Sequence, residues 1–158
     1  MADHEKILAF IAKSESPSDL KRLINNAEAQ GQPEITSAAF RRLVSLVPGE
    51  MPGTLEHDFW SSIQAFEQIK SAAAGKTIKL GYTRRMVRDK GIKATLTNWA
   101  LSTKKTEGFD TLIELGMPEL TGEAVVLRHR GDFPVDVIEA ATKRLVEAEV
   151  DINSVLAG

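Results

Sequence analysis

Hydrophobic residues recur at helical spacing along most of the chain. Between residues 55 and 74, one stripe is formed by Leu55, Phe59, Ile63 and Phe66, and polar residues fill most of the intervening positions. Apolar residues three or four positions apart lie on one face of an α-helix, whereas a half-buried strand would alternate every second residue. The pattern therefore predicts an all-α fold.

Residues that start and stop helices divide this pattern into elements. Ser16 precedes Pro17, and a serine can cap a helix whose first position a proline fits. Gly31 is placed to end that helix in a left-handed conformation. Thr54 and Gly75 bracket the longest predicted helix in the same way. The expected helices cover residues 7–11, 17–30, 33–47, 55–74, 83–90, 92–103, 109–115, 118–130 and 134–150.

The connections between these helices predict the architecture. Residues 76–82 alternate polar and apolar, which permits an extended segment, but a single short strand would have no partner elsewhere in the chain. We therefore interpret this segment as a connector. Short turns place neighbouring helices antiparallel. We expect a compact array of short antiparallel helical hairpins around one longer central helix, residues 55–74.

One segment is a candidate boundary within the chain. Residues 49–53, Gly-Glu-Met-Pro-Gly, form the best candidate linker. It separates N-terminal helical hairpins, residues 1–48, from residues 54–158, which hold the long helix, a basic segment and C-terminal hairpins. Because 48 residues bury little surface alone, we expect one cooperative unit.

A short sequence pattern occurs twice. Residues 31–39 and 116–124 both read G-x-P-E-[IL]-T-x-x-A, and each copy follows a predicted helix. The pattern indicates either a reused helix–Gly–Pro–helix corner or a chance recurrence of residues favoured where one helix ends and the next begins. Two copies do not define a solenoid, which needs at least about three repeats.

Composition narrows the class of protein. The chain has 158 residues, 42% of them hydrophobic, and no cysteine. The length fits one domain, and the lack of cysteine excludes thiolate catalysis, disulfides and Cys-ligated metal centres. No apolar stretch is long enough to span a membrane, and the first residues lack the features of a secretory signal. We therefore expect a cytoplasmic protein that does not bind membranes.

The charge distribution is uneven. Residues 76–105 contain nine basic side chains and one acid, a net charge of +8, whereas the rest of the chain carries -10. A concentrated basic surface binds polyanions because counterions are released from the phosphates. The residues that we expect to bind phosphates are Lys79, Arg84, Arg85, Arg88, Lys90, Lys93, Lys104 and Lys105.

The basic segment has the outline of a helix-turn-helix. Arg84, Arg85 and Arg88 are spaced to share one helical face, and Gly91 separates that helix from the next. The polar residues expected on the outer side of the second helix are Lys93, Thr95, Thr97 and Asn98. However, Lys90 stands where an apolar residue is usual. We therefore expect mainly phosphate contacts and little reading of base sequence.

Two kinds of partner fit these features. The first is nucleic acid, with DNA favoured over RNA. The alternative is a protein-interaction or scaffold module without enzymatic activity, which would bind an acidic protein or a second copy of this chain. The chain carries Asp136, Glu139 and Lys143, the residue types of a nuclease site, but on a predicted helix and not on a strand. We therefore expect no enzymatic activity and no cofactor.

Two further motifs fail as ligand sites. Residues 74–77, Ala-Gly-Lys-Thr, imitate the end of a phosphate-binding loop, but Lys70 stands where that loop needs its first glycine. A helix also precedes the motif, where the loop needs a strand. Glu123, His129 and Asp132 have the side chains of a metal site, but the first two lie on different sides of a predicted helix. We therefore expect no metal.

Overall fold

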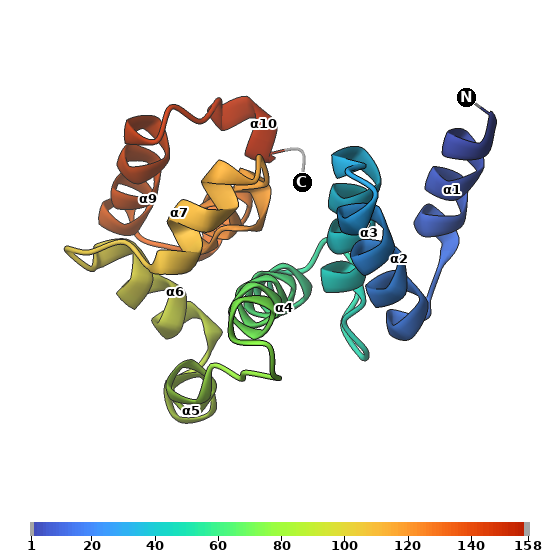
Figure 1. Ribbon diagram of the computed structural model, residues 1–158. Helices are drawn as coiled ribbons and strands as arrows, with labels where there is room; N and C mark the ends of the chain where they lie inside the picture. Colours follow the sequence, from blue (N-terminus) through green and yellow to red (C-terminus); the bar gives the residue numbers. More distant parts are fainter. Residues whose placement is uncertain (1, 157–158) are drawn as a thin grey trace. The chain divides into compact units, whose positions relative to one another are not determined.

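The computed structural model describes residues 2–156 of the chain. Within these residues it contains ten α-helices, two short 3₁₀-helices and no strand (Figure 1). The predicted all-α class is therefore confirmed. No helix in this part of the chain is long and apolar enough to cross a membrane.

The chain divides into two compact units, one ending at Glu50 and the other beginning at Met51. This boundary falls inside the predicted linker, residues 49–53. Cooperative unfolding of the whole chain stays a prediction.

The first unit contains three helices, α1 (Ala2–Lys13), α2 (Pro17–Ala29) and α3 (Pro33–Ser45). As predicted, Ser16 caps α2, because its hydroxyl accepts a hydrogen bond from the amide of Asp19. The three helices share a small core, and α3 packs on both other helices. The buried residues of this core are Ile11, Leu20, Ala27, Ile35, Ala39 and Leu43.

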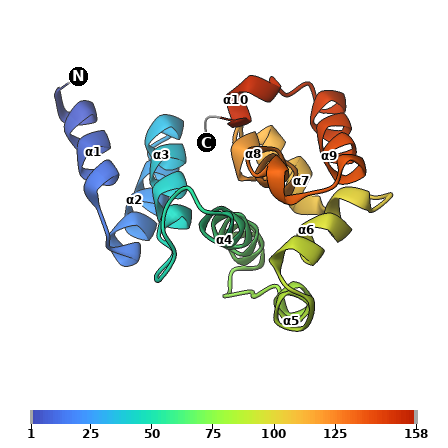
Figure 2. The ribbon, with the colours of Figure 1, turned by 180° about the vertical axis from the view of Figure 1, so that it is seen from behind.

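The second unit is built around a short buried helix. Its elements are α4 (Leu55–Ala74), α5 (Gly81–Lys90), α6 (Ile92–Leu101), α7 (Glu107–Glu114), η1 (Pro118–Leu120), α8 (Gly122–Arg128), η2 (Arg130–Asp132), α9 (Val135–Glu147) and α10 (Ile152–Leu156). Every residue of α8 from 122 to 127 is buried. The helix packs on α4, α6, α9 and α10, and Figure 2 shows it between α4 and α9.

The longest helix has the predicted bounds. The hydroxyl of Thr54 accepts a hydrogen bond from the amide of His57, and α4 begins at Leu55. Gly75 ends the helix with a φ of 69°, a left-handed conformation that glycine adopts without steric cost. Capping residues therefore define both ends of this helix.

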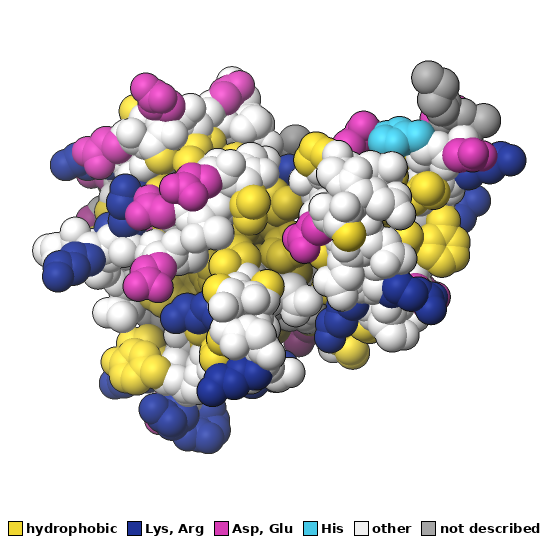
Figure 3. Space-filling model, in the orientation of Figure 1, with side chains coloured by type: hydrophobic (Ala, Val, Ile, Leu, Met, Phe, Trp, Pro, Cys, Tyr) yellow, Lys and Arg dark blue, Asp and Glu magenta, His cyan; other side chains and the backbone are white. Residues whose placement is uncertain are grey.

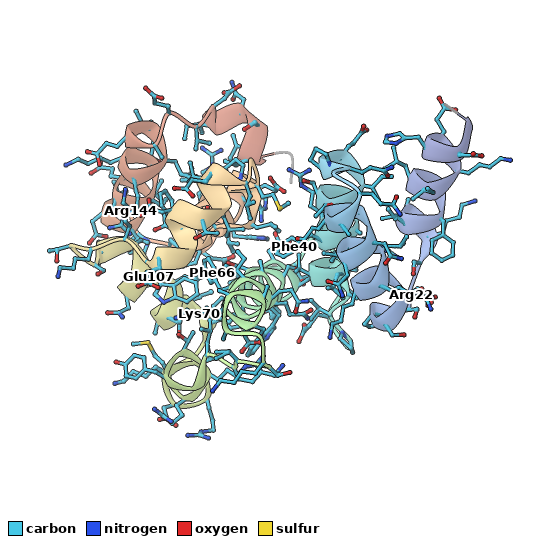
Figure 4. All side chains as sticks on the ribbon, viewed as in Figure 1. Arg22, Phe40, Phe66, Lys70, Glu107 and Arg144 are labelled. Atoms are coloured by element: carbon cyan, nitrogen blue, oxygen red, sulfur yellow. The ribbon has the colours of Figure 1, made fainter. Side chains whose placement is uncertain are left out.

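Glycines allow the aromatic side chains of this unit to pack closely. A Cβ atom at Gly122 would lie 2.5 Å from the ring of Trp99, and one at Gly108 would overlap the ring of Phe66. Figure 4 shows Phe66 pointing from α4 toward the start of α7, near Glu107. Trp99 also stacks on Phe59 with ring centroids 5.8 Å apart. These contacts join α4, α6, α7 and α8.

The prediction of one helix over residues 118–130 is wrong. The chain forms η1 and then starts again as α8, because the hydroxyl of Thr121 accepts a hydrogen bond from the amide of Ala124 and caps a new helix. The final helix is also shorter than predicted. α9 ends at Glu147, Glu149 has a φ of 63°, and α10 was not predicted.

The two copies of the repeated pattern share one turn and then differ. Gly31 and Gly116 both have positive φ, at 65° and 74°. In each copy the amide after the glycine donates to a carbonyl five residues earlier, Gln32 to Ala27 and Met117 to Leu112, each at 2.9 Å. This is the Schellman helix ending. The first copy then continues as α3, whereas the second forms η1 and the Thr121 cap.

Candidate nucleic-acid interface

The basic segment includes a helix that lies on the surface of the second unit. None of the ten residues of α5, all of which the structure describes, is buried. Its outward side chains include Tyr82, Arg85, Arg88 and Lys90, together with the acid Asp89. Figure 3 shows Lys and Arg side chains gathered over α5, beside an exposed hydrophobic side chain. This helix therefore presents the densest group of cations in the segment.

Arg84 does not point outward with Arg85 and Arg88. Its guanidinium forms two hydrogen bonds with the carboxylate of Glu67 on α4, at 2.7 Å from Nε and 2.6 Å from Nη2. The guanidinium carbon of Arg84 also lies 5.3 Å from the ring centroid of Trp60, which is a cation–π distance. The expectation that all three arginines share one outer face is therefore wrong, because Arg84 is bound to Glu67 and Trp60.

Glu67 also holds the connector that leads into α5. Its side chain is only 6% exposed, and its carboxylate accepts a hydrogen bond from the amide of Leu80 at 2.8 Å. The ammonium nitrogen of Lys79 lies 3.8 Å from a carboxylate oxygen of Glu67. Closer to Gly75, the hydroxyl of Ser71 accepts a hydrogen bond from the amide of Ile78 at 2.8 Å. Polar side chains of α4 thus attach both the connector and α5.

Opposing effects set the pKa of Glu67. Burial raises it, but hydrogen bonds from Arg84 and from the Leu80 amide, together with the charges of Arg84 and Lys79, lower it by more. The net result is a lowered pKa. Glu67 is therefore ionised at neutral pH and keeps its hold on Arg84.

Several of the remaining cations have acidic neighbours. Arg88 lies 3.4 Å from Asp89, Lys93 lies 3.3 Å from Asp132, and Lys105 lies 2.9 Å from Asp110. All of these side chains are largely exposed, and such pairs contribute only about 0–1 kcal/mol. A phosphate can therefore compete for the three cations.

Three of the expected residues have no acidic partner within residues 2–156, namely Arg85, Lys90 and Lys104. Arg85 and Lys90 lie on α5, whereas Lys104 follows the far end of α6 together with Lys105. A ten-residue helix is about 15 Å long, so α6 separates these two groups. The structure therefore divides the predicted residues into a larger group around α5 and a smaller one after α6.

The smaller group borders an open hollow that sequence reasoning did not find. The hollow has a volume of about 720 Å³ and is lined by residues from α6, the following loop, α7 and α9. Its charged lining residues are Lys104, Lys105, Asp110, Lys143, Arg144 and Glu147. Arg144, labelled in Figure 4, is already engaged, because it donates to Glu123 and to the carbonyl groups of Trp99 and Ser102.

The second helix of the segment does not offer the expected polar face. Thr95 is buried, and its hydroxyl donates to the carbonyl of Gly91 at 2.9 Å. The expectation that Thr95 lies on the outer side is therefore wrong. Gly91 alone separates α5 from α6, whereas a DNA-reading helix-turn-helix uses a turn of three or four residues. Lys93 and Asn98 remain exposed on α6.

The candidate metal ligands have separate partners. Glu123 pairs with Arg144, His129 lies 2.7 Å from Asp58, and Asp132 pairs with Lys93. Within residues 2–156 no three His, Asp or Glu side chains are placed to hold a metal.

Asp58, Arg128 and His129 form a cluster that joins the start of α4 to the end of α8. Arg128 Nε also donates to this carboxylate, at 3.2 Å. Burial raises the pKa of Asp58, but hydrogen bonds from His129 and Arg128 and the charges of these two residues lower it by more. The pKa of Asp58 is therefore below its ordinary value. These contacts attach the end of α8 to the start of α4.

Comparisons with protein-family models, with curated proteins and with solved structures find no match to this chain. The function of this chain is therefore inferred from its residues and their geometry alone.

Proposed function

We propose that this protein binds nucleic acid through the exposed surface of α5, mainly by contacts to phosphates from Arg85 and Arg88 on one face and from Lys90 at the end of the helix. The observation that carries the proposal is that these cations lie outward on a helix with no buried residue, which is fastened to α4 on its other side. Lys76 and Lys79 before the helix and Lys93 after it are also exposed.

The attachment of α5 makes phosphate binding more favourable. Arg84 and Glu67 form an ion pair that joins α5 to α4, so Glu67 is already neutralised and does not oppose a phosphate. Because the backbone of α5 is already held in place, little conformational entropy is lost when a ligand binds. A short array of fixed cations suits a phosphate backbone, whose charges contribute affinity without sequence information.

The proposal is tested with a triple variant, R85A/R88A/K90A, in a binding assay with labelled DNA. Each phosphate contact contributes a factor of about eight at ~0.1 M salt through counterion release. Losing three contacts is therefore expected to weaken binding more than about 100-fold. Arg84 is left unchanged because its removal would disturb Glu67 and the attachment of the helix.

A matched control removes three exposed lysines from the first unit, K6A/K13A/K21A. It changes the net charge by the same amount but leaves α5 intact. We expect this control to bind like the wild type. Equal loss of affinity in both triple variants would mean that net charge alone drives binding and would refute the assigned surface.

A further inference from the structure

The outer face of α5 carries an aromatic side chain that phosphate binding does not use. Tyr82, the only tyrosine in the chain, is 72% exposed and lies in the first turn of the helix. Large aromatic side chains bury most of their surface in folded proteins. Within residues 2–156 no hydrogen bond or ring contact involves the side chain of Tyr82, so its exposed ring is available to stack on a ligand.

Tyr82 lies beside the outward cations. Arg85 follows it by three residues and Arg88 follows Arg85 by three, and residues at this spacing are neighbours on a helix surface. The side chain of Arg85 extends back over the first turn, because its Nη1 would lie 3.9 Å from a Cβ atom on Gly81. An aromatic ring and a guanidinium therefore share one end of the exposed face.

This end of α5 is also held firmly. The residue before the helix, Leu80, donates its amide to Glu67, and Arg84 binds the same carboxylate one turn into the helix. The Tyr82 backbone lies between these two attachment points. A ligand that uses the ring therefore meets a preformed surface.

From this placement we propose that the ligand is single-stranded nucleic acid, with an unpaired base stacked on Tyr82 and the neighbouring phosphates on Arg85 and Arg88. This inference rests on the function proposed above. In a duplex the bases are stacked on one another, and a ring reaches their faces only by unstacking a base step, which costs free energy. In a single strand every base offers a face, and aromatic stacking tolerates any sequence.

The test compares three ligands with the same number of phosphates per strand. They are a labelled mixed-sequence single strand of about 16 nucleotides, an upper site size for such proteins, its duplex, and an abasic strand of equal length. The wild type is expected to bind the normal strand more tightly than the abasic strand. Y82A is expected to lose about 5- to 100-fold in affinity for the normal strand only. Y82F, which keeps the ring, is expected to bind like the wild type.

The outcomes separate this inference from the proposed function. If Y82A binds all three ligands as the wild type does, or loses affinity equally for all three, base stacking on Tyr82 is refuted. Phosphate binding would stand in both cases, provided that R85A/R88A/K90A still fails to bind. If the wild type binds none of the ligands, the proposed function itself is refuted. Circular dichroism checks that Y82A remains folded, which its exposure leads us to expect.

Discussion

The second unit contains two short helices that are held in opposite ways. The buried residues of α8 include Ala124, Val125 and Val126, and the helix packs on four other α-helices. α5 has no buried residue and depends on polar contacts from α4 and packing against α6. The hydrophobic effect grows with buried apolar area, so it stabilises α8 far more than α5. The difference indicates that α8 maintains the fold, while α5 is a surface element with side chains available for binding.

Each of these helices forms an ion pair between an arginine and a glutamate with a neighbouring helix. Substitution of the two arginines therefore tests the comparison. Arg144 binds Glu123 at 2.8 Å, and both side chains are buried or nearly so. Arg84 binds Glu67, but the arginine is 39% exposed. Burial raises the pKa of Glu123 despite its hydrogen bond with Arg144, whereas the pKa of Glu67 is lowered. The carboxyl of an arginine–glutamate pair thus has a raised pKa where the effect of burial is larger, as at Glu123, and a lowered pKa where hydrogen bonds and charge outweigh burial, as at Glu67.

The largest effect is expected for Arg144→Met. The substitution leaves Glu123 buried without its partner and removes the hydrogen bonds to the carbonyl groups of Trp99 and Ser102. Breaking a buried ion pair costs about 3–5 kcal/mol. The free energy of unfolding is measured in urea by tryptophan fluorescence, which reports on this unit because both tryptophans, Trp60 and Trp99, lie in it. A loss below about 1 kcal/mol would contradict the structural role of the pair.

A smaller and more local effect is expected for Arg84→Met. Hydrogen bonds to a charged group are lost, but solvent screening reduces the cost to about 1–2 kcal/mol. Hydrogen exchange should accelerate in the amides of α5 and remain unchanged in those of α8. Equal acceleration in both helices would show that α5 is not a separately held element.

Acid should release α5 through Glu67. Because the folded-state pKa of this carboxyl is lowered, its stabilising contribution is complete above the ordinary value of about 4.3 and is lost as pH falls below it toward the lowered pKa. We expect the exchange rates of α5 amides in wild type and Glu67→Gln to differ at neutral pH and to converge in acid. A constant difference across that range would contradict ionic attachment.

The smallest effect on stability is expected for Arg85→Ala. Arg85 is exposed and has no acidic partner within residues 2–156. Surface substitutions of this kind usually change stability by no more than about 0.5 kcal/mol. The free energy of unfolding in urea is measured for this variant and for Arg84→Met. A smaller loss for Arg85→Ala would distinguish Arg84, which attaches α5, from Arg85, which we assign to binding. If Arg85→Ala lowered the free energy of unfolding as much as Arg84→Met does, Arg85 would also have a structural role.

Local signals in the sequence predicted most of the helices, because caps and apolar spacing act over a few residues. Ser16, Thr54 and Gly75 have the roles expected of them. Local signals failed where two of them competed. Pro118 predicted a long helix, but Thr121 capped a new one three residues later.

The charge pattern located the basic segment but could not assign its individual residues. Arg84 and Arg85 are adjacent and chemically identical, and the partner that binds Arg84, Glu67, lies 17 residues away along the chain. Burial of Thr95 likewise depends on distant packing partners. Contacts between separate elements have no signature in a single sequence. The hollow lined by α6 and α9 was missed for the same reason.

The most direct test of the α5 surface is the salt dependence of DNA binding. The logarithm of the association constant is measured against the logarithm of salt concentration for the wild type, for R85A/R88A/K90A and for K6A/K13A/K21A. Each lost phosphate contact should reduce the slope by about one. We predict a slope shallower by about three for the α5 variant and an unchanged slope for the control. Equal slopes for the wild type and the α5 variant would contradict phosphate binding by these three residues.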